Sequence, residues 1–345
     1  MRALVNAHVN PGAVPAPSDA AREFHTTMKG YAPTPLRALP AVADELGLGG
    51  VAVKDESARF GLPAFKVLGA SWAVERALRE HPEVDTLVAA SAGNHGRAVA
   101  HVAARRGLRA RIILPARSAP ARRDAIAGEG ADVVVIDGGY EEAVARAADE
   151  GARPGAIEIA DVGDSGPAHW VVDGYATLFA ELADHGDFDV VVVPIGVGSL
   201  GAAAARFGAA GGTAVVGVEP ATAACVTASL AAGEPTTIPT PGTTMAGLDC
   251  AEVSAAVWPE LRAGIHGTVT VTDGEAHAAM RELAAAGLTI GDCCAAPLAA
   301  LRALVTDPAC AALRDAVALG PDTRVALIAT EGPTDPEGYA RALAG

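Results

Sequence analysis

From about residue 50 onward, short apolar segments alternate with alanine-rich segments that have helical spacing. The apolar segments have the length of strands and cover residues 51–54, 86–90, 110–114, 132–136, 156–159, 190–193, 214–218, 267–271 and 325–329. Helical spacing extends over residues 65–79, 168–184, 273–286 and 295–305. Apolar strands separated by helices are typical of a parallel sheet covered on both faces. We therefore expect an α/β protein.

The chain has 345 residues, which is enough for about two domains. No Gly/Ser-rich or Pro-rich linker separates the α/β segments, so we expect two closely packed α/β units. The first 30 residues are rich in Pro and Ala and show weak local preference. We expect an irregular arm there.

The charge balance excludes several classes of partner. The chain has 26 Lys+Arg against 41 Asp+Glu, a net charge of −15, and only 4% aromatic residues. Such a chain lacks the basic surface and the stacking side chains that nucleic acids need, and anionic membranes repel it. The uncharged run 190–205 is shorter than a membrane span and contains Pro194 and several glycines. With no apolar leader at the N-terminus, we expect a cytoplasmic protein that binds neither nucleic acid nor membrane.

Cysteine usage indicates reduced thiols. The number of cysteines is odd and no C-x-x-C pair occurs, which argues against a disulfide framework and a structural zinc site. The five are Cys225, Cys250, Cys293, Cys294 and Cys310.

Lysine is rare in this chain, which has only Lys29, Lys54 and Lys66. Lys66 stands at the start of a predicted helix between Phe65 and Leu68. Apolar surroundings would lower the pKa of this lysine, as an imine-forming amine requires. A surface lysine with a buried stem is the alternative.

A glycine-rich turn, Gly-Val-Gly-Ser-Leu-Gly over residues 196–201, follows one predicted strand and precedes a helix. Together with Glu219, which ends the next strand and could accept ribose hydroxyls, it has the pattern of a dinucleotide site. That pattern favours an NAD(P)-dependent oxidoreductase. The same backbone N–H groups would also bind any phosphate monoester, so both possibilities remain open.

Two further polar turns lie where strands end. In the turn over residues 91–96, hydroxyl, amide and N–H groups could bind a carboxylate, and Asn94 could reach a ring hydroxyl. Thr330, after the strand 325–329, could offer its hydroxyl to a cofactor ring. Each turn could equally be a helix cap.

Taken together, these segments resemble the pyridoxal-phosphate (PLP) enzymes of fold type II, and among them the diaminopropionate ammonia-lyases. The resemblance runs in order over about residues 25–340. Its segments are 33–36, 54–57, 59–62, 64–66, 93–97, 170, 174–176, 196–198, 218–220, 245–250, 330–332 and 334–336. The segments 59–62 (Arg-Phe-Gly-Leu) and 246–250 (Ala-Gly-Leu-Asp-Cys) are specific to the lyases, whereas Gly-Asn-His-Gly belongs to the wider fold.

The resemblance implies two doubly wound α/β domains of the tryptophan synthase β-like kind, with the cofactor in the cleft between them. Residues 1–77 and 178–345 would form the large cofactor-binding domain, and residues 78–177 the smaller one. It also implies a homodimer.

Roles for individual residues follow from the same resemblance. Lys66 would hold pyridoxal 5'-phosphate as a Schiff base, Asn94 would contact the ring hydroxyl, and Thr330 would face the pyridine nitrogen. A hydroxyl at that nitrogen leaves the ring neutral, which favours elimination over transamination. The residues implied to cradle the phosphate are Gly196, Val197, Gly198 and Ser199. Those implied to take the substrate carboxylate are Ser91, Ala92, Gly93 and His95.

The chain departs from the lyase pattern at three places. Ala92 stands where an aspartate credited with removing the α-proton of the D-isomer is common. Asp161 is the nearest match to a second, catalytic family aspartate, and Asp164 is the alternative. The usual glycine-rich turn after a Gly-Glu pair is replaced by Gly-Asp-Cys-Cys over residues 291–294, where we considered a metal site and expect none.

The leading hypothesis is a PLP-dependent carbon-nitrogen lyase that performs α,β-elimination on a small amino acid. The most plausible substrate is L-2,3-diaminopropionate, which would give pyruvate and ammonia. A serine or threonine dehydratase and a β-replacement synthase are the nearest alternatives. An NAD(P)-dependent oxidoreductase and a catalytically silent binding protein are alternatives of other classes.

Overall fold

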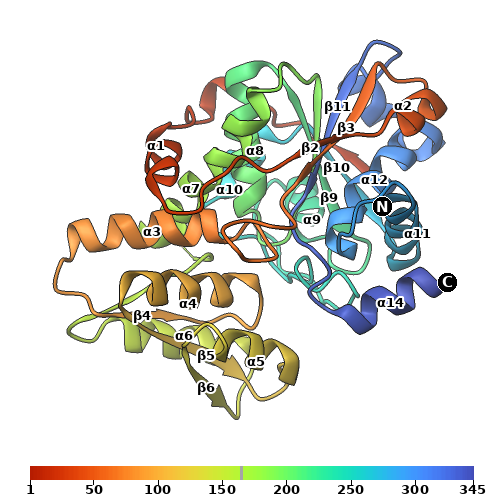
Figure 1. Ribbon diagram of the computed structural model, residues 1–345. Coiled ribbons are helices and arrows are strands. Elements are labelled where there is room, and N and C mark those ends of the chain that lie inside the picture. The colour runs from red at the N-terminus through yellow and green to blue at the C-terminus, as the bar shows by residue number, and fades with distance from the viewer. Residues whose placement is uncertain (164–165) are drawn as a thin grey trace. The chain divides into compact units, whose positions relative to one another are not determined.

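The computed structural model describes residues 1–163 and 166–345, which form two compact units (Figure 1). The larger unit comprises Met1–Asp19, Lys29–Phe65 and Ala176–Gly345. The smaller unit comprises Ala20–Met28 and Lys66–Tyr175. Residues 20–28 and 66–77 therefore group with the smaller unit, whereas we expected them in the larger domain. That the larger unit is the cofactor-binding one stays a prediction.

A seven-stranded sheet forms the centre of the larger unit. Its order is β1 (Ala3–Val5), β10 (Gly267–Val271), β9 (Ala214–Pro220), β8 (Val190–Pro194), β11 (Arg324–Ala329), β3 (Gly50–Asp55) and β2 (Leu36–Ala38). The five inner strands are parallel, and the two edge strands pair antiparallel with β10 and β3. Every residue of β8, β9 and β10 is buried, which explains why these strands are mostly apolar.

Helices cover both faces of this sheet. Helix α12 (Asp292–Thr306) packs along β8, β9, β10 and β11, with α11 (Asp273–Ala285) against it. Helix α8 (Ser199–Gly211) packs on β8 and β9 and against α10 (Trp258–Gly264), on the other side of the strands in Figure 1. The remaining helices that lie wholly in this unit are α2 (Pro40–Leu46), α9 (Cys225–Ala232), α13 (Ala311–Ala316) and α14 (Pro336–Ala344).

The smaller unit has a parallel four-stranded sheet. Its order is β6 (Asp132–Ile136), β5 (Arg109–Pro115), β4 (Thr86–Ala89) and β7 (Ala156–Glu158). Ile112 and Ile113 of β5 point to opposite faces, because Ile112 lies beside Gly96 of α4 and Ile113 packs with Ala143 of α6. The helices are α1 (Ala20–Thr27), α3 (Val67–Glu80), α4 (Asn94–Arg106), α5 (Pro120–Ala127) and α6 (Tyr140–Gly151). Helix α7 (Gly166–Ala183) contains the boundary between the units.

The structure confirms the α/β class with two sheets, and the nine predicted strands form with ends that differ by at most two residues. The four predicted helices also form. The prediction of an irregular N-terminal arm was wrong, since this segment contains β1 and α1. The sequence analysis also missed β2. Both missed strands have three residues and lie at sheet edges, where a partner strand rather than an apolar run selects the conformation.

Among the described residues, no single helix is long and apolar enough to cross a membrane. One sharply bent pair, Asp292–Thr306 with Pro308–Ala316, does meet that test by length and composition.

Four charged side chains are buried together in the larger unit. They are Lys54, Glu56, Arg59 and Glu181, whose side chains are at most 1% exposed. Glu181 accepts hydrogen bonds from Lys54 Nζ at 2.7 Å and from Arg59 Nη1 and Nη2 at 2.7 Å each. Arg59 also donates to Glu56 through Nε at 2.8 Å and Nη2 at 2.6 Å. Two cations thus balance two carboxylates, as burial of charge requires.

The same four side chains hold the segment that leads to Lys66. After β3 the chain makes a tight turn in which Arg59 and Leu62 exchange backbone hydrogen bonds of 2.8 and 3.0 Å. Phe60 and Gly61 within it have φ of 54° and 86°. A left-handed Phe is unfavourable, and the ion pairs of Arg59 hold the turn that imposes this conformation. Lys54 and Arg59 therefore have structural partners.

Replacing Glu181 by Gln should destabilise the protein by about 3–5 kcal/mol, because it leaves Lys54 without its carboxylate and two buried cations with Glu56 as their remaining countercharge. Burial raises the pKa of Glu181, but Arg59 and Lys54 outweigh it and lower the pKa from 4.5 to about 2. The stabilisation from ionised Glu181 is therefore present above pH 4.5 and is lost as the pH falls toward about 2. Urea unfolding at several pH values measures both effects.

The matched control is Glu282→Gln. Glu282 pairs with Arg302 through side chains that are 31% and 29% exposed, so water replaces the lost charge and the free energy of unfolding should change little. Equal losses in the two variants would contradict the special role of the buried group.

Candidate active site

Lys66 immediately precedes α3, as the sequence predicted. Its side chain is 22% exposed, and Nζ donates to Asp161 Oδ2 at 3.0 Å. The ammonium lies 5.7 Å from the ring centroid of Tyr175. Asp161 follows β7, so the ends of two segments far apart in the sequence meet here.

The electrostatics of this pair differ from the sequence-based expectation. Burial alone would lower the pKa of Lys66, but Tyr175 and Asp161 outweigh it and the pKa is raised. The pKa of Asp161 rises through burial, and His95 and Lys66 more than reverse this and bring it to about 2. The predicted lowering was therefore wrong for this state, because the sequence did not reveal the carboxylate 3.0 Å away.

Close packing below Lys66 explains why glycines belong to the matched segments. A Cβ on Gly69 would lie 2.6 Å from the Tyr175 ring and 2.8 Å from Val171. A Cβ on Gly174 would lie 2.6 Å from the carbonyl oxygen of Leu68. Helix α3 and the first half of α7 thus touch through their backbones, and this holds Tyr175 beside the lysine.

The turn over residues 91–96 links β4 to α4, and Asn94 is the first residue of the helix. The Gly93 N–H donates to Ser91 Oγ at 3.3 Å. A Cβ on Gly96 would lie 2.1 Å from the Ser91 carbonyl oxygen, so only glycine permits this turn. Ala92 is partly exposed, and its methyl group cannot accept a proton.

His95 was predicted as part of a carboxylate-binding loop, but its imidazole turns inward. The side chain is 3% exposed, and Nε2 donates to the Ile159 carbonyl at 2.7 Å. Nδ1 lies 3.7 Å from Asp161 Oδ2. The smaller unit therefore brings Lys66, His95 and Asp161 together, whereas Asp164, the alternative to Asp161, lies outside the described residues.

In the larger unit, the turn over residues 196–199 connects β8 to α8. Gly198 has φ of 109°, and a Cβ there would lie 2.5 Å from Leu261 of α10. A Cβ on Gly196 would lie 2.9 Å from the Gly247 carbonyl and 3.0 Å from Cys250 Sγ. The segment 246–250 thus packs directly on this turn. The first N–H groups of a helix have no partner within the helix and favour an anion.

Glu219 does not support the dinucleotide interpretation. Its buried carboxylate accepts from Val226 N and Thr227 N at 2.7 Å each and from Thr227 Oγ1 at 2.6 Å. Burial raises the pKa of Glu219 to about 7. The carboxylate satisfies the first turn of α9 and is not available for ribose hydroxyls, so that expectation was wrong.

Thr330 is buried at the end of β11 and has a partner that the sequence analysis missed. Its hydroxyl oxygen lies 3.3 Å from Cys294 Sγ, and the Glu331 N–H donates to the same sulfur at 2.8 Å. The Phe65 N–H donates to the Thr330 carbonyl at 3.0 Å, and Lys66 is the next residue along the chain. The altered segment 291–294 was the signal that could have indicated a new contact here.

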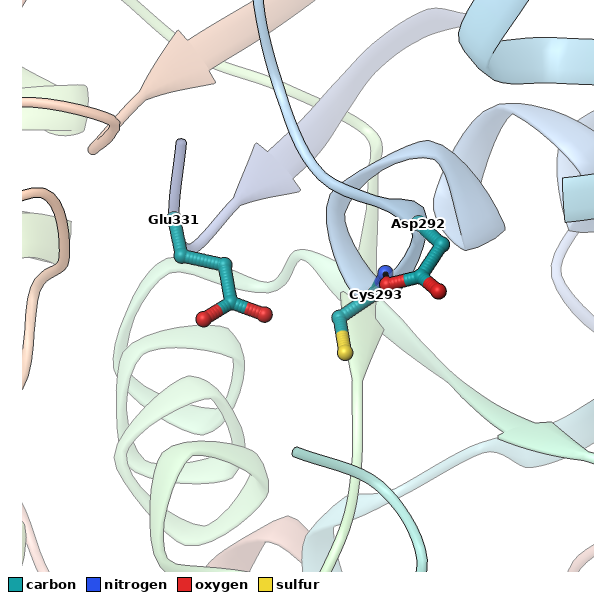
Figure 2. Close-up of side chains that lie close together, drawn as sticks. All are labelled: Asp292, Cys293 and Glu331. Carbon is teal, nitrogen blue, oxygen red and sulfur yellow. Dashed lines mark hydrogen bonds between the residues drawn. The ribbon is translucent and has the colours of Figure 1, made fainter. Parts of the chain in front are cut away.

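Glu331, which follows Thr330 in the chain, belongs to a small cluster shown in Figure 2. Asp292, Cys293 and Glu331 face one another, and their potential metal-binding atoms lie within 4.8 Å of one another. The sequence analysis considered Cys294 in place of Glu331. A thiol binds a metal as thiolate, but burial, followed by the charge of Glu331, raises the pKa of Cys293 far above its ordinary value. The absence of a resident metal stays a prediction.

Comparison with known proteins gives a consistent assignment. A family model described as pyridoxal-phosphate dependent enzyme matches residues 27–331. Diaminopropionate ammonia-lyase of Escherichia coli (strain K12) is 32% identical, with 92% of this chain and 89% of that protein covered. The biosynthetic L-threonine dehydratase of Corynebacterium glutamicum is 34% identical over 61% of this chain and 49% of that protein.

A solved structure supports the same conclusion. Diaminopropionate ammonia lyase from Escherichia coli, in complex with an aminoacrylate-PLP azomethine reaction intermediate, matches with a TM-score of 0.90 and 31% identity. The match covers 99% of this chain and 96% of that chain. In the larger unit, the turn before α8 has the close backbone that a phosphate needs, and Thr330 offers a buried hydroxyl. In the smaller unit, Lys66 offers an amine. That these residues hold the cofactor stays a prediction. The chain belongs to the pyridoxal-phosphate dependent enzyme family, and its cofactor is pyridoxal 5'-phosphate.

Proposed function

We propose that this protein is a carbon-nitrogen lyase that converts L-2,3-diaminopropionate to pyruvate and ammonia by α,β-elimination. The observation that carries the proposal is the ion pair of Lys66 and Asp161. It supplies an amine and a carboxylate that can exchange a proton, within a chain similar throughout to diaminopropionate ammonia-lyases.

The bound cofactor would withdraw electrons from the substrate carbon skeleton. The protein would position the substrate and supply the proton for the leaving group. We assign phosphate binding to Gly196, Val197, Gly198 and Ser199, at the N-terminus of α8. We assign the cofactor link to Lys66, the contact with the ring hydroxyl to Asn94, and the contact with the ring nitrogen to Thr330. Support for Thr330 comes from the hydrogen bond between its carbonyl and Phe65, the neighbour of Lys66.

We assign the substrate carboxylate to the Ser91 hydroxyl and the backbone N–H groups of the turn formed by Ser91, Ala92, Gly93 and His95, since the His95 imidazole points inward.

Dehydration of threonine or serine is the second candidate, because a threonine dehydratase is among the relatives. The two reactions share their first step and differ in the β-substituent that leaves. We also propose a cytoplasmic homodimer, on the basis of the family resemblance.

Borohydride reduction of the protein loaded with pyridoxal phosphate, followed by peptide mapping, should place the pyridoxyl group on Lys66. Lys66→Ala should abolish ammonia release from L-2,3-diaminopropionate, because the variant lacks both the link and the base. Lys29→Ala, at an exposed position, is the control and should retain activity. A pyridoxyl group on Lys29 or Lys54, or faster dehydration of threonine than release of ammonia from diaminopropionate, would contradict the proposal.

Gly198→Ala should weaken binding of pyridoxal phosphate to the apoprotein at least about tenfold, or about 1.4 kcal/mol. The added methyl group would lie 2.5 Å from Leu261 and displace the backbone that surrounds the phosphate. Absorbance titration measures the dissociation constant.

Gly212→Ala is the matched control at the opposite end of α8. Gly212 also has a positive φ, 73°, but a Cβ there has no neighbour within 4 Å. This variant should carry the backbone strain without loss of cofactor affinity. Equal affinity for pyridoxal phosphate in the two variants would contradict the assignment of the turn over residues 196–199 to the phosphate site.

The L-isomer of diaminopropionate should be preferred over the D-isomer by a factor on the order of 10², which is the usual contribution of one positioned base. Abstraction from opposite enantiomers requires bases on opposite faces of the planar adduct. Ala92 cannot accept a proton, so only the face served by Lys66 is active. Steady-state kinetics with each enantiomer measures the ratio.

Ala92→Asp should gain activity on the D-isomer, and Ala92→Asn, which has the same size but no basic group, should not. Comparable turnover of both enantiomers by the unmodified protein would refute the assignment. Asp161 would then be the first candidate for the second base.

A further inference from the structure

One carboxylate oxygen, Asp161 Oδ2, faces two basic groups in the smaller unit. It accepts from Lys66 Nζ at 3.0 Å and lies 3.7 Å from His95 Nδ1. These distances connect the lysine to the imidazole through a single atom. A proton could therefore pass between them without reorganisation of the backbone.

The imidazole is in a defined tautomer. A carbonyl oxygen only accepts, so the 2.7 Å contact with Ile159 places a hydrogen on Nε2 of His95. In the neutral ring Nδ1 then carries only a lone pair. This atom is buried and has no hydrogen-bond partner among the described residues. A buried basic nitrogen without a hydrogen bond is costly and calls for an explanation.

The charge on Lys66 determines what this nitrogen can do. A lone pair opposite an ionised carboxylate is repulsive, unless a proton lies between them. Burial lowers the pKa of His95; Asp161 raises it, and Lys66 lowers it again. Two more titratable neighbours of Asp161 lie in the described part of the smaller unit. Burial and Asp161 raise the pKa of Glu158 to about 6, and burial raises the pKa of Tyr175 to about 12. If Lys66 becomes neutral, its positive charge no longer lowers the pKa of Asp161 or of His95.

We propose that Asp161 and His95 take up one proton when Lys66 loses its positive charge, and that His95 stores this proton for the leaving group of the reaction. The acceptors are Asp161 Oδ2 and His95 Nδ1, which lie 3.7 Å apart and would come within hydrogen-bond distance when one of them is protonated. His95 acts through Asp161 and is a positioning residue in this scheme. The role for the leaving group rests on the proposed function, whereas the uptake of the proton does not.

The proton balance closes over one turnover. Neutral Lys66 removes the α-proton and becomes an ammonium. The β-carbon–nitrogen bond breaks with its electron pair on nitrogen, and the amine takes the stored proton from the Asp161–His95 pair and leaves as ammonia. Loss of a proton from the Lys66 ammonium to Asp161 Oδ2 then restores the pair. No further acid is needed.

The uptake can be measured without catalysis. In the full-length chain labelled with ¹³C and ¹⁵N at histidine, NMR titration follows the His95 ring, which is assigned by its loss in His95→Gln. Lys66→Met should raise the pKa of His95 by at least one unit relative to the unmodified chain. Lys29→Met should leave it unchanged, and adding Asp161→Asn to Lys66→Met should reverse the rise. An unchanged pKa in Lys66→Met would overturn the proposal.

A comparison of leaving groups tests the second part. An amine needs a proton to leave, whereas chloride does not. His95→Gln should therefore lower kcat for L-2,3-diaminopropionate about 10²-fold or more, and should lower kcat for chloride release from β-chloro-L-alanine far less. Equal losses would show that His95 is only structural. If the unmodified protein catalyses elimination from neither substrate, the proposed function is wrong. The NMR titration would still test the proposed proton uptake.

Discussion

The buried group of Lys54, Glu56, Arg59 and Glu181 sets the geometry on which the rest of the protein depends. Charges without water must have partners, so the end of β3, the following turn and α7 are held in one arrangement. The turn bears an unfavourable Phe60 conformation and leads within a few residues to Lys66. The segment that precedes Lys66 is thereby held by ion pairs, and their four charged side chains have no role in the proposed chemistry.

The charged groups around Lys66 differ from the buried group, because they can exchange a proton with one another. Asp161 keeps the Lys66 amine protonated in the free protein. Among the described residues, Nδ1 of His95 has no hydrogen-bond partner. Two buried ionic groups of similar composition thus have different uses. In the group around Arg59 every charge has a partner of opposite sign. In the group around Lys66, Nδ1 of His95 lacks a hydrogen bond, and we propose that a proton moves through this atom.

Sequence reasoning predicted the strands correctly, because most buried parallel strands are rich in apolar residues. It singled out Lys66 because lysine is scarce, and the role of Lys66 stays a prediction. It failed where a contact between distant segments decides the outcome. The pairing of β1 with β10, the pKa of Lys66, the use of Glu219 at α9 and the thiol beside Thr330 all depend on residues between 7 and more than 200 positions away. None of these partners leaves a local pattern. The boundary between the units has the same character, since residues 20–28 join α3 through contacts and not through sequence proximity.

The crowded turn between β4 and α4 has an evolutionary consequence. Gly96 has no freedom to change, because any side chain would strike the Ser91 carbonyl. Ala92, four residues earlier, is partly exposed and carries no such restriction. A lineage could therefore exchange the residue at 92 while the path of the backbone stays constant. The preference for one substrate enantiomer would then evolve independently of the fold. Related enzymes with opposite preferences could differ at a single codon.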